Sequence, residues 1–268
     1  MIRLERKLET KTLIEVFSIT PSAVSGLSIE QLRQQPVFLG NQPVELGELF
    51  SVSGDPADLH HRWTGNLSRV GGIGYQMESG WIQVDGPVGN HLGSRMSGGS
   101  IQVSGDAGDF LGAEMTGGLI HVRGNAGHSA GATYDGGQLG QNGGVILVEG
   151  SAADLVGSGM RRGVIAVAGD VGDRCGFNMK AGTIVVLGQV GRQLGQEMIR
   201  GSICLMQEPK DPFPGFAAGG WQVLPVPGLL NVYLKELGFR HAWGAARWQI
   251  RHGDLLHGGR GELLIAGS

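Results

Sequence analysis

Hydrophobic residues alternate with other residues in short segments that recur through the middle of the chain. The segments follow the pattern Ile-x-Val, with leucine in place of valine in the last, and a period of two in such apolar, mostly β-branched residues is typical of a β-strand. A helix would instead repeat about every 3.6 residues. The segments predicted as strands are Ile82–Val84, Ile101–Val103, Ile120–Val122, Ile146–Val148, Ile165–Val167, Ile184–Val186 and Ile203–Leu205.

Glycines recur in step with these strands, at spacings of 19 residues with one step of 26. A strand with glycine turns cannot close a core alone, so such units must stack on one another. We expect the glycines to supply positive φ at the corners. The pattern predicts a mostly β fold, a right-handed parallel β-helix (solenoid) of about seven 19-residue coils over residues 67–206. The first of three glycine sets is Gly86, Gly105, Gly124, Gly150, Gly169 and Gly188.

Equivalent residues of successive coils should stack in columns inside the helix. One column has a methionine in every coil except the fourth, where Gln141 takes its place. We interpret this column as core filling by a flexible apolar side chain rather than as a metal or redox feature. Cys175 falls in a second apolar column, so it is expected to be buried and unreactive.

The two flanks lack the repeat and are predicted to be small α/β caps, residues 1–66 at one end and residues 207–268 at the other. Ser28 and Gln31 form a capping box that begins a short helix. Leu229–Leu237 is predicted to be another helix, ended by a glycine. Such caps would cover the strand edges at the ends of the coils, so we expect one continuous domain.

The middle residue of each predicted strand should face outward. It is polar in early coils, as at Gln83 and Gln102, and apolar in later ones, as at Leu147, Ala166 and Val185. An outward apolar stripe requires a cover. Either the C-terminal flank, with its tryptophans, or a partner protein supplies it.

One corner of the coils becomes basic toward the C-terminal end of the repeat. Arg161, Arg162, Lys180 and Arg200 stand where earlier coils have small or polar residues. They form either an ordinary solvated face or a contact for an acidic partner or an anionic cofactor tail.

The fourth coil carries a seven-residue insertion within residues 132–140. Its Tyr134 and Asp135 must leave the coil, and loops on rigid scaffolds often make functional contacts. We expect this loop to take part in an interaction.

Composition and charge argue against several classes of function for this protein. The net charge of −3 gives no global support for nucleic-acid binding. The two cysteines are too few for a disulfide scaffold and match no zinc spacing. No apolar run reaches the roughly 18 residues that cross a membrane, and the first residues do not resemble a signal peptide, so the cytoplasm is the expected compartment.

Motifs for catalysis are also missing from the sequence. Gly127–Gly131 matches the G-x-S-x-G nucleophile elbow, but it is the copy of Gly108–Gly112, where Phe110 replaces the serine. No catalytic residue, metal site or bound cofactor is expected on this chain. A catalytic β-helix such as a polysaccharide lyase would cluster acids, arginines or Ca²⁺ ligands on one face, whereas here the outward aspartates are scattered.

The repeat resembles the glycine-rich β-helix of the large subunit of glutamate synthase and the C subunit of formylmethanofuran dehydrogenase. The flanks favour the second family. Residues 46–54 are similar to the segment before the repeat of that C subunit, and Gly253–Leu255 with Gly259–Leu263 is similar to its C-terminal stretch. The likeness covers nearly the whole chain.

The resemblance implies a non-catalytic scaffold or partner-binding subunit, the C subunit of the related formyltransferase/hydrolase complex of bacteria that oxidise one-carbon compounds. Such a complex moves a formyl group from tetrahydromethanopterin to a methanofuran-type carrier and releases formate, with zinc in other subunits. The implied partners are an amidohydrolase-like subunit and a formyltransferase subunit. The glutamate-rich tails of such carriers are one candidate ligand for the basic corner. A molybdenum or tungsten formylmethanofuran dehydrogenase and a glutamate synthase-like module stay open as alternatives.

Overall fold

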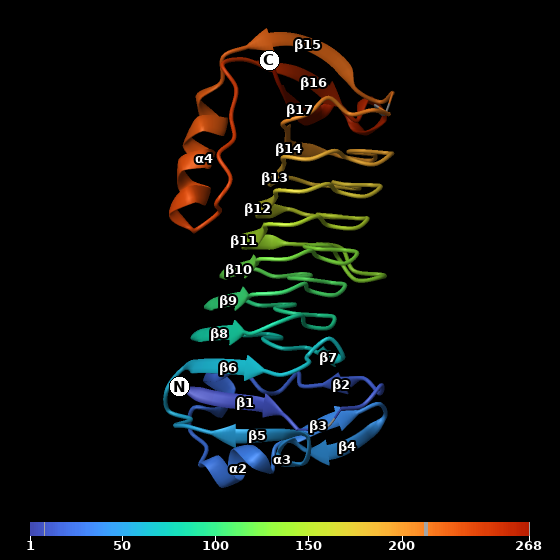
Figure 1. Cartoon of the computed structure of the whole chain (residues 1–268). Helices are drawn as coiled ribbons and strands as arrows, with labels where there is room; N and C mark the ends of the chain where they lie inside the picture. The colour runs from blue at the N-terminus through green and yellow to red at the C-terminus, as the bar shows by residue number, and fades with distance from the viewer. Residues whose placement is uncertain (8, 212–213, 268) are drawn as a thin grey trace.

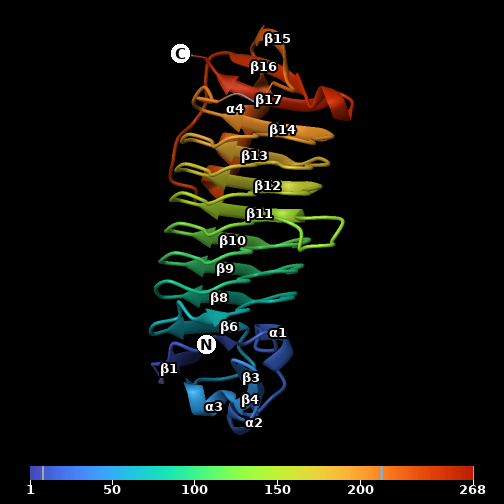
Figure 2. The ribbon, with the colours of Figure 1, turned by 90° about the vertical axis from the view of Figure 1, so that its right-hand side faces the viewer.

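The computed structural model describes residues 1–7, 9–211 and 214–267. Its centre is a stack of coils that each contribute one strand to a long sheet (Figures 1 and 2). Each strand pairs in parallel with the next in chain order, which confirms the predicted mostly β architecture. The strands are β8 (Trp81–Val84), β9 (Ser100–Val103), β10 (Leu119–Val122), β11 (Asn142–Val148), β12 (Arg162–Val167), β13 (Thr183–Val186) and β14 (Arg200–Leu205).

The register of the sheet follows the sequence repeat. Ile101 pairs with Ile82 on one side and with Ile120 on the other, so equivalent residues stack directly. A second row of parallel bridges joins the coils from Leu67 to Val190. Two lines of main-chain contact therefore hold successive coils together.

The interior columns form the core. All the methionines of the predicted column are fully buried, as are the isoleucines of the strands. Gln141 is equally buried, and its side-chain amide donates to the carbonyls of Gly143 and Gly144 at 3.1 and 2.9 Å. Gln141, the one residue of the column that is not methionine, thus supplies hydrogen bonds to backbone carbonyl groups where the insertion returns to the coil.

Glycine serves the coils in two ways, and the prediction of positive φ for all three sets was wrong for one. In the set that begins at Gly86, only Gly86 has a positive φ. At Gly124 a Cβ atom would instead lie 2.7 Å from the carbonyl carbon of Gly105 and 2.8 Å from the nitrogen of Asp106. In this set, close approach of the coils rather than backbone conformation requires the glycines after Gly86.

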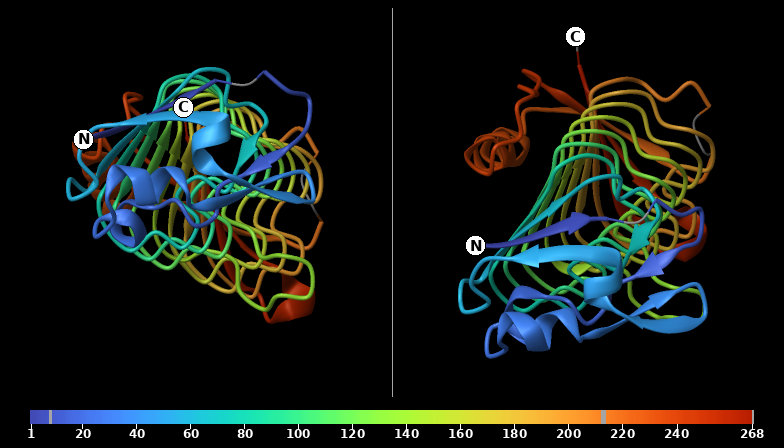
Figure 3. Two further views of the ribbon diagram at one scale, coloured as in Figure 1. Left: turned by 90° about the horizontal axis from the view of Figure 1, so that it is seen from below. Right: turned by 60° about the horizontal axis from the view of Figure 1, so that its bottom comes forward.

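The N-terminal flank lies across one end of the coils (Figure 3). The capping box of Ser28 and Gln31 is present at the start of α2, as predicted. Strand β6 pairs in parallel with β8, so the long sheet continues into this flank. Its elements are β1 (Ile2–Arg6), β2 (Ile14–Glu15), α1 (Pro21–Val24), α2 (Ile29–Arg33), β3 (Pro36–Leu39), β4 (Gln42–Glu45), α3 (Leu46–Leu49), β5 (Phe50–Ser53), β6 (His60–Thr64) and β7 (Val70–Gly71).

The C-terminal flank extends the sheet at the other end, where β17 pairs in parallel with β14. The predicted helix exists, but it begins at Pro225 rather than at Leu229, because proline is well suited to the first helical position. Gly238, with φ of 94°, follows its end. The elements are β15 (Ala217–Gln222), α4 (Pro225–Glu236), β16 (Trp248–Gly253), η1 (Leu255–His257) and β17 (Arg260–Ala266).

The C-terminal flank covers the outward apolar stripe. Leu147, Ala166 and Val185 form one buried cluster with Phe239 and Trp248 from this flank. Helix α4 lies over the same face beside the later strands (Figure 1). Of the two covers that the sequence left open, the chain's own C-terminal segment is the one observed, whereas Trp221 remains half exposed.

Candidate functional site

A basic groove lies where three successive coils meet the C-terminal flank. Arg161, Lys180, Ile199, Arg200 and Arg260 line this groove, whose volume is about 320 Å³. Arg161 and Lys180 lie on the corners before β12 and β13, and Arg200 is the first residue of β14. Arg260 enters because it is the partner of Arg200 in the β14–β17 pairing. Neighbouring strands lie about 4.8 Å apart, so the cations form a row along the stack.

Among the described residues, no acidic side chain lines this groove. Within the residues that the structure describes, Arg161, Arg200 and Arg260 make no ion pair. Lys180 donates a hydrogen bond only to Asn178, at 3.3 Å. Two other exposed arginines on the coils are paired with an acid, Arg192 with Asp173 at 2.8 Å and Arg95 with Glu114 at 2.9 Å. Like charges held side by side repel one another, so the groove favours an anion.

The six residues singled out in the sequence divide between different places. Arg161, Lys180 and Arg200 line the groove together, while Arg162 is exposed and pairs with Asn142 across the sheet. Tyr134 lies in a separate cleft, and Asp135 is exposed in the insertion.

That second site is an aromatic cleft of about 380 Å³ lined by Phe17, Tyr75, His91, Arg95 and Tyr134. Tyr134 hydrogen-bonds to Nδ1 of His91 at 2.9 Å, which ties the insertion to an earlier coil. Burial raises the pKa of the Tyr134 hydroxyl and lowers the pKa of the His91 imidazole, so both groups are neutral near pH 7.

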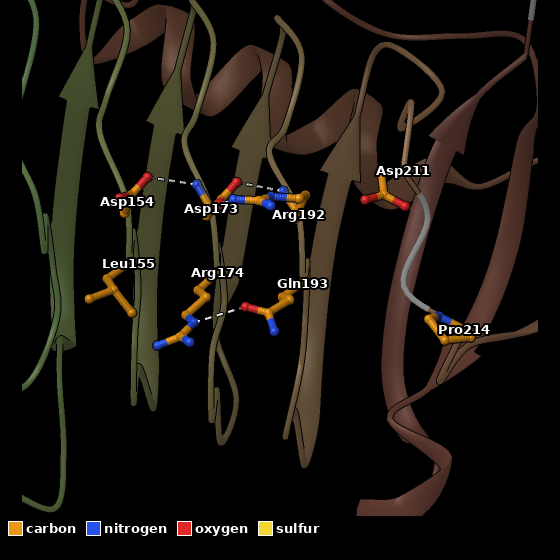
Figure 4. A pocket seen from close by; sticks show the side chains of 8 residues that line it. All are labelled: Asp154, Leu155, Asp173, Arg174, Arg192, Gln193, Asp211 and Pro214. Carbon is orange, nitrogen blue, oxygen red and sulfur yellow. Dashed lines mark hydrogen bonds and ion pairs between the residues drawn. The ribbon is translucent and has the colours of Figure 1, made fainter.

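A third and larger groove, of about 540 Å³, runs along the later coils (Figure 4). Its polar groups hold the coils to one another: Oδ1 of Asp154 accepts the backbone N–H of Asp173, and Asp173 in turn accepts from Arg192. The backbone N–H and the guanidinium of Arg192 lower the pKa of Asp173. These carboxylates serve as structural acceptors in a ladder between coils.

Several buried titratable groups are either kept uncharged by burial or held in contacts between the coils and the C-terminal flank. Burial raises the pKa of the thiols of Cys175 and Cys204 to about 12, so both are protonated and unreactive, as predicted for Cys175. Glu149 accepts from Nε2 of His121 at 2.6 Å. Nε2 of His241 lies 2.9 Å from the other carboxylate oxygen of Glu149, a contact that ties the C-terminal segment to the coils. Within residues 1–7, 9–211 and 214–267, no three metal-binding side chains gather, and no helix is long and apolar enough to cross a membrane.

Comparisons with known proteins identify the family. The model of the GXGXG motif matches residues 68–215. A chain in the crystal structure of the formyltransferase/hydrolase complex from Methylorubrum extorquens, in complex with methylofuran, superimposes with a TM-score of 0.92 and 32% identity, covering 99% of this chain and 100% of that one. The chain belongs to the C-subunit family of formyltransferase/hydrolase complexes and formylmethanofuran dehydrogenases.

Curated members of this C-subunit family share shorter stretches. The C subunit of the molybdenum-containing formylmethanofuran dehydrogenase 1 of Methanothermobacter thermautotrophicus is 40% identical over 81 residues, which are 30% of this chain and 20% of that relative. The C subunit of the tungsten-containing formylmethanofuran dehydrogenase 2 of Methanothermobacter marburgensis is 35% identical over 97 residues, 35% of this chain and 36% of that relative. The chain therefore aligns with about a third or less of these two proteins.

In this C-subunit family member, the sequence did not predict Arg260 of the basic groove, nor any lining residue of the aromatic cleft except Tyr134. Arg260 was overlooked because it lies in the flank, although Arg260-Gly261 copies the Arg200-Gly201 of the last coil, a signal that could have found it. Phe17 carries no such signal, since only the folding of the N-terminal flank brings it to Tyr75.

Proposed function

We propose that the chain is a non-catalytic scaffold subunit of a formyltransferase/hydrolase complex, and that its coils form a right-handed parallel β-helix on which partner subunits dock. The complex would transfer a formyl group from formyl-tetrahydromethanopterin to a methanofuran-type carrier and release formate. One observation carries the proposal: 99% of the chain superimposes on a chain of such a complex.

The state of the polar groups supports a non-catalytic role. Both thiols are buried and protonated. Aspartates that face outward, such as Asp154 and Asp173, accept hydrogen bonds from the next coil and are not free to act as acid or base. Catalysis would then fall to an amidohydrolase-like subunit and a formyltransferase subunit, which would also hold the zinc and the pterin.

The basic groove is the proposed contact of this subunit for an acidic segment of a partner or for the anionic tail of the carrier. Arg161, Arg200 and Arg260 present guanidinium groups, which bind carboxylates in a two-pronged geometry. Among the described residues, no acidic side chain lines the groove, so an incoming carboxylate would not compete with a carboxylate of this chain for the guanidinium groups.

Isolation of the native complex tests this proposal. The chain should purify at low salt with a zinc-containing amidohydrolase-like subunit and a formyltransferase, without molybdenum or tungsten. Mass spectrometry of the subunits and metal analysis are the measurements. A chain that purifies alone would contradict the scaffold role.

A second candidate is the C subunit of a molybdenum or tungsten formylmethanofuran dehydrogenase, favoured by the identity to those relatives. Iron–sulfur subunits with molybdenum or tungsten in the same preparation would establish it. Amidotransferase and flavin partners would instead indicate a glutamate synthase-like module.

A further inference from the structure

A second cavity adjoins the basic groove on the outer face of the long sheet. Its volume is about 400 Å³, and it lies between the start of α4 and the strands that α4 covers. Leu224, Val226 and Leu230 form its wall on the helix side, and Cys204 and Leu264 belong to the wall on the sheet side. We call this space the α4 cavity.

The strands of the sheet connect the α4 cavity to the basic groove. Leu264 belongs to the cluster outside the sheet, so the alternation along β17 puts Arg260 and Glu262 on the same outer face. Arg260 lines the groove and Glu262 lines the cavity, and two residues of a strand span about 7 Å. The same step separates Arg200 of the groove from Ser202 of the cavity on β14. The two spaces are therefore neighbouring parts of one surface.

The charge of this combined surface is positive. The four cations of the groove face no acid among the described lining residues. In the described lining of the α4 cavity, Glu262 is the one acidic residue, and its carboxylate accepts a hydrogen bond from the Ser202 hydroxyl at 3.0 Å. Because the cations outnumber this carboxylate, the surface attracts an anion to the groove and not to the cavity.

The apolar part of the α4 cavity is only partly covered by this chain. Cys204 and Leu264 are buried, whereas Val226, on the opposite wall, is 65% exposed. An exposed apolar side chain beside an apolar depression is typical of a surface that a partner covers. The cavity therefore suits an apolar group, next to a groove that suits carboxylates.

We propose that the basic groove and the α4 cavity together bind one extended acidic segment of a partner subunit. Its carboxylates pair with the cations of the groove, and a neighbouring apolar side chain of the same segment fills the α4 cavity. Glu262 keeps further carboxylates out of the cavity and is placed to accept a backbone N–H of the segment. This inference rests on the proposed function, because it requires a partner subunit.

A protein segment fits this surface better than the tail of a carrier does. A tail made of glutamates would satisfy the cations of the groove but has no apolar side chain for the α4 cavity. Only an occupant that carries both kinds of group covers Val226 while it neutralises Arg200 and Arg260.

Two valines of α4 test the apolar part of the site. Val226→Ser changes a wall of the α4 cavity, whereas Val232→Ser changes a similarly exposed valine of the same helix, 57% exposed, that does not line it. In the reconstituted complex, Val226→Ser should weaken association of this subunit by about fivefold or more at low and at high salt. Val232→Ser should stay within about twofold of the wild type. Thermal unfolding checks that both variants fold.

Arg260→Gln tests the charged part of the site. It should weaken association by about threefold or more at low salt, and the difference from the wild type should shrink at high salt, because salt screens the lost attraction. Arg174→Gln, which removes the charge of an arginine outside the groove, should stay within about twofold of the wild type at both salt concentrations.

Photo-cross-linking identifies the occupant. A benzophenone amino acid at Ile199, in the groove, and in a second variant at Val226 should capture the same partner segment, with acidic residues next to an apolar one. Equal affinities of Val226→Ser and Val232→Ser, two unrelated segments, a segment without acids, a captured carrier tail or no cross-link would overturn the inference and leave the scaffold role intact. Failure of the wild-type chain to associate with any partner would instead refute the proposed function.

Discussion

At the scale of single residues, successive coils approach each other closely at glycines such as Gly124. The side chain of Asp106 reaches over this position, and its Oδ1 accepts the backbone N–H of Asn125 at 2.7 Å. The same arrangement recurs further along the stack, where Asp170 accepts the backbone N–H of Gln189. The aspartate and the glycine are thus a matched pair, one bridging the coils and the other making room.

Gly124→Ala should therefore lower the free energy of unfolding by about 2 kcal/mol, since the added methyl meets the backbone of the preceding coil. Chemical denaturation measures the change. Gly228→Ala in α4 is the matched control, because no atom of the described chain lies within 4 Å of its Cβ, and it should stabilise the protein slightly. Equal effects of the two substitutions would contradict the close-approach explanation.

His61 is the residue whose ionisation should matter most for stability. It pairs with Ile82 across the sheet, is 1% exposed, and neither ring nitrogen has a hydrogen-bond partner in the described part of the chain. Burial lowers the pKa of its imidazole from 6.5 to about 4. The folded protein therefore keeps this ring neutral at pH values where the unfolded chain protonates it.

Because the unfolded chain binds this proton more readily, stability should fall as the pH drops from 6.5 toward 4. At pH 5 the loss from His61 should be about 2 kcal/mol. His61→Leu should remove that part of the pH dependence, whereas His60→Leu, at its exposed neighbour, should not. Denaturation curves at pH 7 and pH 5 give the comparison, and an unchanged pH dependence in His61→Leu would refute this assignment.

At the scale of elements, the corner before each late strand places one cation per coil in the basic groove. Arg161 precedes β12, Lys180 precedes β13 and Arg200 begins β14. The 19-residue spacing aligns Arg161 with Lys180 once the strands pair in register, and Arg200 follows Ile199, the equivalent residue of the next coil.

The double substitution Arg161→Gln with Lys180→Gln should weaken low-salt association with an anionic partner by about tenfold. The free energy of unfolding should stay constant or rise, because repulsion within the groove is relieved. Titration calorimetry and denaturation measure the two effects. Arg174→Gln, a charge loss at an exposed arginine outside the groove, should leave association unchanged; an equal loss there would indicate a general charge effect.

At the scale of the whole molecule, the C-terminal flank is part of the core rather than an appendage. Trp248 is almost fully buried and packs with Trp243, their ring centroids 6.3 Å apart, in the cluster that covers the later strands. Glu149 adds a polar tie through His241. The long sheet, the cover and the cap are therefore one packed unit in the described residues.

Trp248→Ala should lower the free energy of unfolding by about 3–5 kcal/mol and expose the apolar stripe over Leu147 and Val185. Denaturation and binding of a hydrophobic dye measure the two changes. Trp221→Ala is the control, because this tryptophan is 51% exposed and should cost far less. A small effect of Trp248→Ala would indicate that the cover is dispensable for stability.

The sequence by itself determined the repeat, its register and the buried columns, because each coil contacts only its neighbours and every neighbour carries the same pattern. It also aligned Arg161 with Lys180, for the same reason, and placed Arg200 one position beyond their column. The domain boundaries at residues 66 and 206 and the functional role of these cations stay predictions.

Only the tertiary structure decided which flank residues join the repeat. Arg260 enters the basic groove through pairing of β14 with β17, and Phe17 reaches Tyr75 through the fold of the N-terminal flank. The cover of the apolar stripe was decided in the same way, by Phe239 and Trp248. These contacts join segments without a shared period, so no local pattern encodes them, and they form only when the flanks pack against the finished coils.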